Sequence, residues 1–134
     1  MSNKPTVLFI CQHNAGRSQL GAALLELLDA ERFVAASAGI SPDSHVNPAI
    51  AASVAELGLD ISGRVPRAVT VDDLNSADVV VLMKPGLALP SVPTGKVIEW
   101  SIADPASWGI DDVRPMREAV AERIRQEIIV GGQK

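Results

Sequence analysis

The sequence predicts an α/β fold: a three-layer sandwich in which a four-stranded parallel sheet is flanked by helices. Several short apolar runs lack polar alternation, which is typical of strands that are covered on both faces. Segments with apolar residues at helical spacing lie between these runs, as right-handed crossovers between parallel strands require. The chain has 134 residues, enough for one hydrophobic core, and 1–134 is expected to form a single domain.

The N-terminal half contains two predicted strands, each followed by a predicted helix. Residues 7–10 form a β-rich apolar run, and a helix begins at about Ser18. Its apolar positions recur three or four residues apart, at Leu20, Ala23, Leu24, Leu27 and Leu28. Residues 33–38 predict the second strand, and Asn47 with Pro48 predicts the cap and first turn of the second helix. The buried stripe of this helix is expected at Ile50, Val54 and Leu57, before Gly58 ends it.

The C-terminal half contains two more predicted strands and a long last helix. The pair Asp72 and Asp73 predicts the cap and first turn of a short helix. Residues 78–83 are rich in β-branched side chains and predict a central strand, and residues 96–100 predict the fourth. A helix is expected from Asp111 to about residue 130. Its buried face is predicted to consist of Val113, Met116, Val120, Ile124 and Ile128.

The composition excludes several classes of partner. Twelve Lys and Arg residues against sixteen Asp and Glu residues give a net charge of −4, so no basic face is expected for nucleic acid or anionic lipid. A hydrophobic share of 47% with 21% charged residues is typical of a globular domain. No apolar run approaches the ~20 residues that span a bilayer. We therefore expect a cytoplasmic protein with no nucleic-acid or membrane partner.

The chain has one cysteine, Cys11, which directly follows the first predicted strand. The loop Cys11–Ser18 connects that strand to a helix, so several backbone N–H groups and the positive end of the helix dipole converge on one point. This arrangement favours binding of a tetrahedral oxyanion. The loop residues expected to bind it are Gln12, His13, Asn14, Ala15, Gly16, Arg17 and Ser18.

Each polar residue of the loop has an expected role. Arg17 offers a planar, charged fork for two oxygens of the anion. The same positive field favours the thiolate form of Cys11, and Ser18 can donate a hydrogen bond to it. Gly16 permits a tight turn and Asn14 tolerates a positive φ. A buried Cys11 that only ends a core strand is the alternative, but the strand, loop and helix together favour an anion-binding active site.

The eight-residue loop resembles that of the low-molecular-weight protein tyrosine phosphatase superfamily, and more narrowly that of the arsenate reductases built on this fold. The resemblance continues in family order through residues 37–39, 47–62, 78–83 and 100–105. It implies a four-stranded parallel sheet flanked by helices. It also implies that Asp104 is the general acid that protonates the departing oxygen. Without the resemblance, Asp104 and Pro105 would be interpreted as an ordinary turn.

Two features bear on the choice between reductase and phosphatase. The stretch from His13 to Gly16 is closer to the reductases, and the chain has no tyrosine to form an aromatic wall for phosphotyrosine. Trp108 is the aromatic candidate for that wall, and covering the core is an equally good interpretation of it. A low-molecular-weight phosphatase and a non-catalytic oxyanion or redox sensor remain the alternatives.

The resemblance also implies an external thiol. Thioredoxin-coupled relatives carry two more cysteines after the third strand, whereas residues 83–90 contain none. A second sulfur must therefore come from outside, as in the single-cysteine members that resemble transferases joining arsenate to mycothiol. A mycoredoxin or another glutaredoxin-like protein would complete the reduction. In this scheme Cys11 attacks the bound arsenate, and the external thiol resolves the adduct as an arseno-thiol or as arsenite.

No metal ion and no bound cofactor are expected. Cys11 and His13 lack further ligands at a suitable spacing, and His45 lies in a polar loop. Ala22 stands where many thioredoxin-coupled members have a glutamate associated with a monovalent cation. Arg64 and Arg67 could steer an anion inward, although a solvated surface is the favoured interpretation.

Overall fold

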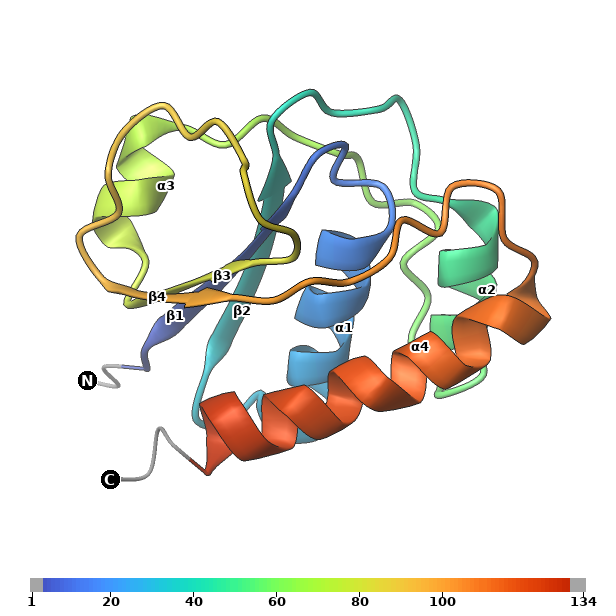
Figure 1. Ribbon diagram of the computed structural model, residues 1–134. Coiled ribbons are helices and arrows are strands. Elements are labelled where there is room, and N and C mark those ends of the chain that lie inside the picture. The colour runs from blue at the N-terminus through green and yellow to red at the C-terminus, as the bar shows by residue number, and fades with distance from the viewer. Residues whose placement is uncertain (1–3, 131–134) are drawn as a thin grey trace.

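The computed structural model describes residues 4–130 and contains one four-stranded, all-parallel sheet (Figure 1). The strands are β1 (Thr6–Cys11), β2 (Val34–Gly39), β3 (Val79–Leu82) and β4 (Lys96–Glu99), and their order in the sheet is β2-β1-β3-β4. The predicted fold class is confirmed. β1 is central, and its register places Cys11 beside Gly39 of β2 and Ile10 beside Leu82 of β3.

Helices cover both faces of the sheet (Figure 1). One layer contains α1 (Arg17–Asp29), α2 (Pro48–Ala55) and α4 (Ile110–Arg123), which continues as the π-helical turn η1 (Ile124–Ile129). The short helix α3 (Val71–Ser76) lies on the opposite face. The three-layer arrangement follows from β1, whose side chains are apolar on both faces.

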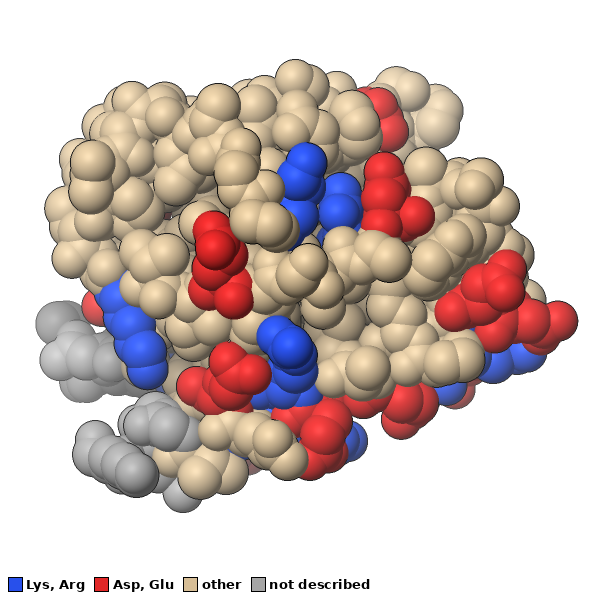
Figure 2. Space-filling model, viewed as in Figure 1, with Lys and Arg blue, Asp and Glu red and all other residues tan. Residues whose placement is uncertain are grey.

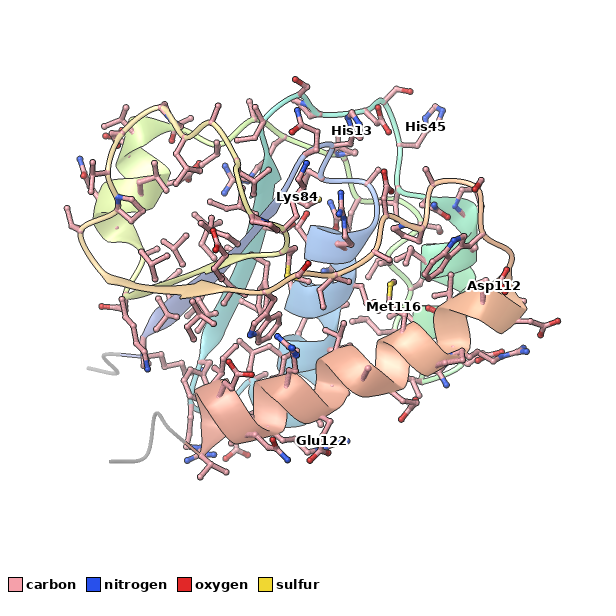
Figure 3. The ribbon with its side chains drawn as sticks, viewed as in Figure 1. His13, His45, Lys84, Asp112, Met116 and Glu122 are labelled. Carbon is pink, nitrogen blue, oxygen red and sulfur yellow. The ribbon has the colours of Figure 1, made fainter. Side chains whose placement is uncertain are left out.

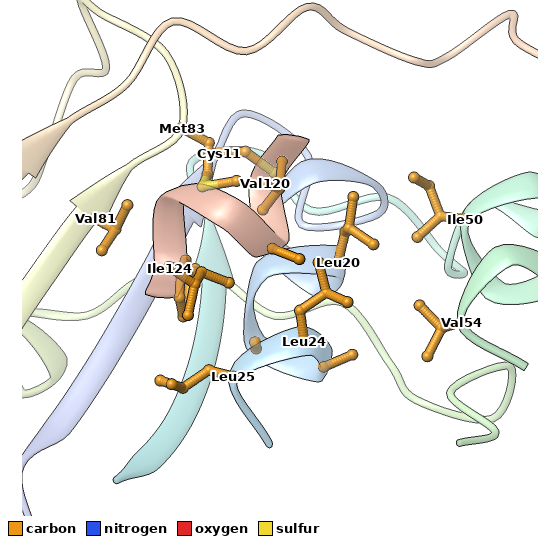
Figure 4. Packing of buried hydrophobic residues seen from close by; sticks show 14 of the residues in the cluster. Cys11, Leu20, Leu24, Leu25, Ile50, Val54, Val81, Met83, Val120 and Ile124 are labelled. Carbon is orange, nitrogen blue, oxygen red and sulfur yellow. The ribbon is translucent and has the colours of Figure 1, made fainter. Parts of the chain in front are cut away.

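The core is accordingly divided between the two faces. Val7, Phe9 and Cys11 of β1 pack in the larger cluster with side chains of α1, α2 and α4. Leu8 and Ile10 point the other way, into a smaller cluster with α3. Cys11 lies at one end of the larger cluster, close to Met83 (Figure 4). Its side chain therefore faces the layer that contains α1.

Two local predictions are wrong. Leu57 is not buried: α2 ends at Ala55, and Leu57 is 44% exposed in the turn before Gly58, whose φ is +96°. The short helix is capped by Thr70 and not by an aspartate. The Thr70 side chain accepts from the N–H of Asp73, and the Asp73 carboxylate accepts from the N–H of Thr70, so Asp73 completes a capping box.

Charged side chains gather over α4, along the lower edge of the view in Figure 2. Glu56, in the turn after α2, bonds both Arg114 and Arg117 of α4, so ion pairs join these two helices. Within residues 4–130, no helix is both long enough and apolar enough to cross a bilayer.

Candidate active site

Cys11 lies at the carboxyl end of β1, where the strand order of the parallel sheet switches from one side of β1 to the other. The crossover through α1 leads from β1 to β2 on one side, whereas β3 pairs with β1 on the other side. Ligands of open α/β sheets bind at such a switch point, beyond the carboxyl ends of the strands. The topology therefore places the cysteine loop where a binding site is expected.

The backbone of the loop is oriented by the segment that follows β2. The carbonyl oxygens of Gln12, His13 and Ala15 accept from the backbone N–H groups of Ser41, Asp43 and Asn47, at 2.7, 3.0 and 2.8 Å. Across a trans peptide bond, a carbonyl and the following N–H point in opposite directions. The N–H groups of His13 and Gly16, which follow two of these carbonyls and belong to residues that line the pocket, therefore point to the inner side of the loop, where an oxyanion can accept from them.

The first turn of α1 adds to this positive field. Its N-cap is Gly16, which provides no side-chain cap, so the first N–H groups of the helix are left for a ligand. By contrast, α2 and α3 are capped by the side chains of Asn47 and Thr70. The N–H groups at the start of α1 are thus left for a ligand, unlike those of α2 and α3, and this suits anion binding.

The sulfur of Cys11 is buried and forms a hydrogen bond with the hydroxyl of Ser18. Cys11 is 2% exposed, and its Sγ lies 3.0 Å from Oγ of Ser18. Nδ2 of Asn14 donates to the same Oγ at 2.7 Å. Because an amide nitrogen only donates, the hydroxyl hydrogen of Ser18 is free to point at the sulfur. The contact between the two atoms is present as expected, and its geometry allows Ser18 to donate to the sulfur.

Asn14 is itself fixed by residues outside the predicted site. Its φ is +51°, as expected, and its Oδ1 accepts from Nε2 of Gln19 at 3.3 Å and from the N–H of Arg67 at 2.9 Å. Nε2 of Gln19 also donates to the backbone carbonyl of Asn14 at 3.0 Å. Gln19 is not among the residues predicted from the sequence. Its position directly after Ser18, in the first turn of α1, is the signal that could have identified it.

Arg17 begins α1 and lines the same pocket as Cys11. It is 6% exposed, and its Nη1 donates to the carbonyl oxygen of Ile102 at 3.0 Å. The loop that contains Asp104 therefore holds the guanidinium on one side. The remaining N–H groups of a guanidinium can bind an oxyanion.

Asp104 also lines this pocket. Its Oδ1 accepts a hydrogen bond from the backbone N–H of Ala106 at 3.1 Å, which forms an Asx-turn. The next residue, Pro105, is tied to α2, because Nδ2 of Asn47 donates to its carbonyl oxygen at 3.2 Å. A Cβ built on Gly16 would lie 3.2 Å from the Pro105 ring, so the two loops approach closely. Asp104 is thus brought to the cysteine loop by contacts that are distant in sequence.

The pocket has a volume of about 510 Å³. Cys11, His13, Ala15, Gly16 and Arg17 line it, whereas Gln12, Asn14 and Ser18 do not. Asn14 and Ser18 therefore act from behind the sulfur. The wall contributed by other segments consists of Asp43, Ser44, His45, Val46, Asn47, Pro48, Ala49, Asp104, Pro105, Ala106 and Trp108. His45 and Trp108 thus border the site, and Trp108 also packs against the core.

Arg64 and Arg67 do not line this pocket, in agreement with the surface position that the sequence favours for both. Nη2 of Arg64 lies 3.0 Å from Oε2 of Glu26, and Nη1 of Arg67 lies 2.9 Å from Oδ2 of Asp73. Burial raises the pKa of Asp73, but bonds from Arg67 and Thr70 outweigh it and hold the pKa below its usual value. In the part of the chain from 4 to 130, no three His, Cys, Asp or Glu side chains cluster to hold a metal ion.

The fold and the site define a class of protein in which a cysteine at the carboxyl end of a parallel strand lines one pocket together with an arginine of the following helix and an aspartate of a distant loop. The sequence profile of low molecular weight phosphotyrosine protein phosphatases matches residues 6–129. The chain therefore belongs to the low molecular weight phosphotyrosine protein phosphatase family.

Relatives within this fold bear the name arsenate reductase. A thioredoxin-dependent arsenate reductase from Corynebacterium glutamicum is 34% identical with a TM-score of 0.78, and the match covers 93% of this chain and 60% of that longer chain. A structure of an arsenate reductase in the phosphate binding state is 28% identical with a TM-score of 0.80, and the match covers 90% of this chain and 94% of that chain. The glutaredoxin arsenate reductase of Synechocystis is 31% identical over 91% of this chain and 95% of its own.

Proposed function

We propose that this protein is a cytoplasmic arsenate reductase that works as an arsenate–thiol transferase with an external low-molecular-weight thiol. The observation that carries the proposal is the buried Cys11 sulfur, which forms a hydrogen bond with Oγ of Ser18 at 3.0 Å. Cys11 and Arg17 line the same pocket. The relatives named as arsenate reductases support arsenate as the substrate. Mycothiol, with a mycoredoxin or another glutaredoxin-like protein downstream, is the proposed source of the second sulfur.

The first step joins sulfur to arsenic. Arsenate binds to the loop N–H groups and Arg17, and the Cys11 thiolate attacks arsenic. A bond from Sγ to arsenic forms as one arsenic–oxygen bond breaks, and the oxygen leaves as water after Asp104 supplies a proton. Arsenic stays in the +5 state, because this step is a substitution and transfers no electrons between sulfur and arsenic.

The second step requires a thiol that the chain does not contain, because Cys11 is its only cysteine. If the external thiolate attacks arsenic, Cys11 leaves as a thiolate and an arseno-thiol is released. If it attacks Sγ of Cys11, a disulfide forms, the sulfur–arsenic electron pair stays on arsenic, and arsenite leaves. The two sulfurs then lose two electrons together, and arsenic gains them.

The proposal is tested by offering arsenate with mycothiol, glutathione or reduced thioredoxin in separate reactions and following the arsenic species by mass spectrometry. Mycothiol is expected to support turnover, and thioredoxin alone is not, because no internal thiols relay oxidation from Cys11. Cys11→Ser should abolish product while phosphate binding persists, and Asp104→Asn should lower kcat by about 10²-fold or more. Turnover without any thiol would contradict the proposal.

Phosphatase activity is the second candidate, because the family profile that matches is that of phosphotyrosine phosphatases. In that reaction water, and no thiol, would release phosphate from Cys11. Hydrolysis of p-nitrophenyl phosphate at a higher kcat/KM than arsenate reduction would favour it.

A further inference from the structure

The thiol that resolves the arsenate adduct reaches the pocket mostly protonated, since simple thiols have a pKa near 8.5. Only the thiolate is nucleophilic, so a group in the pocket that takes the thiol proton would speed this step. We propose that His13 is this catalytic base. The inference rests on the proposed function and adds a residue whose side chain has had no role so far.

The position of His13 suits this role. It lies two residues after Cys11 and lines the same pocket as Cys11 and Arg17. Its side chain is 46% exposed, so it meets solvent at the mouth of the pocket, from which a thiol must enter. Figure 3 shows His13 at the end of the molecule where the cysteine loop lies, with His45 nearby.

A hydrogen bond selects the tautomer of His13. Nδ1 lies 3.1 Å from the carbonyl oxygen of Ser41. A carbonyl oxygen only accepts, so Nδ1 carries the hydrogen and the neutral ring keeps its lone pair on Nε2. The segment of Ser41 is fixed in place, because its N–H donates to the carbonyl oxygen of Gln12 at 2.7 Å. Nε2 is therefore the nitrogen available to accept a proton.

A carboxylate lies beside the same ring nitrogen of His13. Oδ1 of Asp43 lies 3.8 Å from Nδ1 of His13, and the N–H of Asp43 donates to the carbonyl oxygen of His13 at 3.0 Å. The other charged or titratable groups of the pocket are Cys11, Arg17, His45 and Asp104. Arg17 is engaged with the anion in the proposed reaction, so its charge is neutralised when the thiol arrives.

Asp104 is the competing base, since it is a carboxylate after it has protonated the departing oxygen. A carboxyl group ordinarily titrates near pH 4 and imidazole near 6.5, so imidazole is the better match for a thiol proton. Asp104 is also bonded to the N–H of Ala106 through Oδ1. These two facts favour His13.

The atoms and electrons of the proposed step balance whether the thiolate attacks arsenic or the sulfur of Cys11. The thiol S–H bond breaks, its proton bonds to Nε2 of His13, and its electron pair stays on sulfur. The thiolate then attacks arsenic and displaces the Cys11 thiolate, or attacks Sγ of Cys11 and releases arsenite as arsenic takes the electron pair. The proton leaves the imidazolium to the departing oxyanion or to solvent, which restores His13.

The test compares wild type, His13→Gln and His45→Gln with saturating arsenate and 2-mercaptoethanol as the thiol. Glutamine keeps an N–H donor for the Ser41 carbonyl but has no basic nitrogen. At about pH 6.5 the thiol is protonated, and His13→Gln should lower kcat/KM for the thiol by about 10²-fold. At about pH 10 the thiol is already ionised, and the loss should shrink to within about threefold.

The His45→Gln variant is the matched control, because its wild-type imidazole lines the same pocket with Nε2 3.3 Å from Oγ of Ser44. Its ratio to wild type should not change with pH. Alkylation of Cys11 by iodoacetamide checks that the loop is intact, and His13→Asn replaces His13→Gln if the latter fails this check.

A His13→Gln loss that is equal at both pH values, or no loss at either, would overturn the role of His13 as a base. Absence of wild-type turnover with 2-mercaptoethanol, mycothiol and glutathione alike would contradict the proposed function itself. The two failures are therefore distinguishable.

Discussion

Asn47 connects α2 to Pro105: its Oδ1 accepts from the N–H of Ala49 at 2.9 Å, and its Nδ2 donates to the Pro105 carbonyl at 3.2 Å. One side chain therefore caps a helix and holds the loop that carries Asp104. The two functions can be separated, because aspartate is as good a cap as asparagine but has no N–H to donate.

We therefore expect Asn47→Asp to lower kcat by about tenfold, because Asp104 loses a support and small misplacements of a catalytic group are costly. The melting temperature should stay close to that of wild type. Asn47→Ala is the comparison, since it removes the cap too and should cost about 1 kcal/mol of stability. Equal kcat values for wild type and Asn47→Asp would show that the bond to Pro105 does not position Asp104.

Removal of the Ser18 hydroxyl should lower the reactivity of Cys11 at neutral pH. A hydrogen bond to a charged group contributes about 1.5–3 kcal/mol, so Ser18→Ala should slow iodoacetamide alkylation by roughly 10-fold to 100-fold. Ser53→Ala is the control, because Ser53 is also fully buried but donates to the Ile50 carbonyl in α2. An unchanged alkylation rate in Ser18→Ala would exclude Ser18 as a donor to the sulfur.

Gly39 allows the cysteine loop to lie directly against β2. A Cβ at this position would lie 2.7 Å from the backbone nitrogen of Asn14, and real Cβ atoms essentially never come within 3.0 Å of another such heavy atom. Gly39→Ala should cost roughly 2 kcal/mol or more in urea unfolding and abolish phosphate binding. Gly63→Ala is the matched control, since no atom lies within 4 Å of the Cβ that it adds. Similar losses in both variants would contradict a specific role of Gly39.

The contact between α2 and α4 should weaken in acid. Hydrogen bonds from Arg114 and then Arg117 lower the pKa of Glu56 from 4.5 to about 2. A lowered carboxyl pKa stabilises the fold above the unfolded pKa, and this contribution is lost as pH falls from 4.5 towards 2.

Thermal unfolding of Glu56→Gln checks this prediction. The variant should melt below wild type at pH 7, and the two curves should converge as the solution is acidified below pH 4.5. Glu31→Gln, in the turn after α1, should show no such convergence. A gap for Glu56→Gln that stays constant with pH would contradict the assigned ion pairs.

Monovalent cations should not affect the rate. Oδ1 of Asn14 already accepts from Gln19 and Arg67, so no lone pair is left for a cation, and Ala22 offers no carboxylate beside it. Turnover in potassium chloride and in N-methylglucamine chloride at equal ionic strength should agree. A rise that occurs with potassium alone would show that a cation binds there.

Much of the site could be predicted because it is contiguous. Cys11, Arg17 and Ser18 lie within eight residues between a strand and a helix, and the backbone geometry of that connection follows from local patterns. The positive φ of Asn14 was expected for the same reason. Asp104, about ninety residues further on, was found only through the family resemblance.

The sequence by itself determined the strands and helices and the chemistry of the cysteine loop, because both depend on residues within a few positions of one another. Tertiary structure decided which distant groups meet at the site: the N–H of Arg67 at Asn14, Asn47 at Pro105, and the Ser41 carbonyl at His13. These contacts depend on how the crossovers lay the loops that follow β1, β2 and β4 against one another. No local pattern encodes that placement, since it is set by the packing of helices on both faces of the sheet.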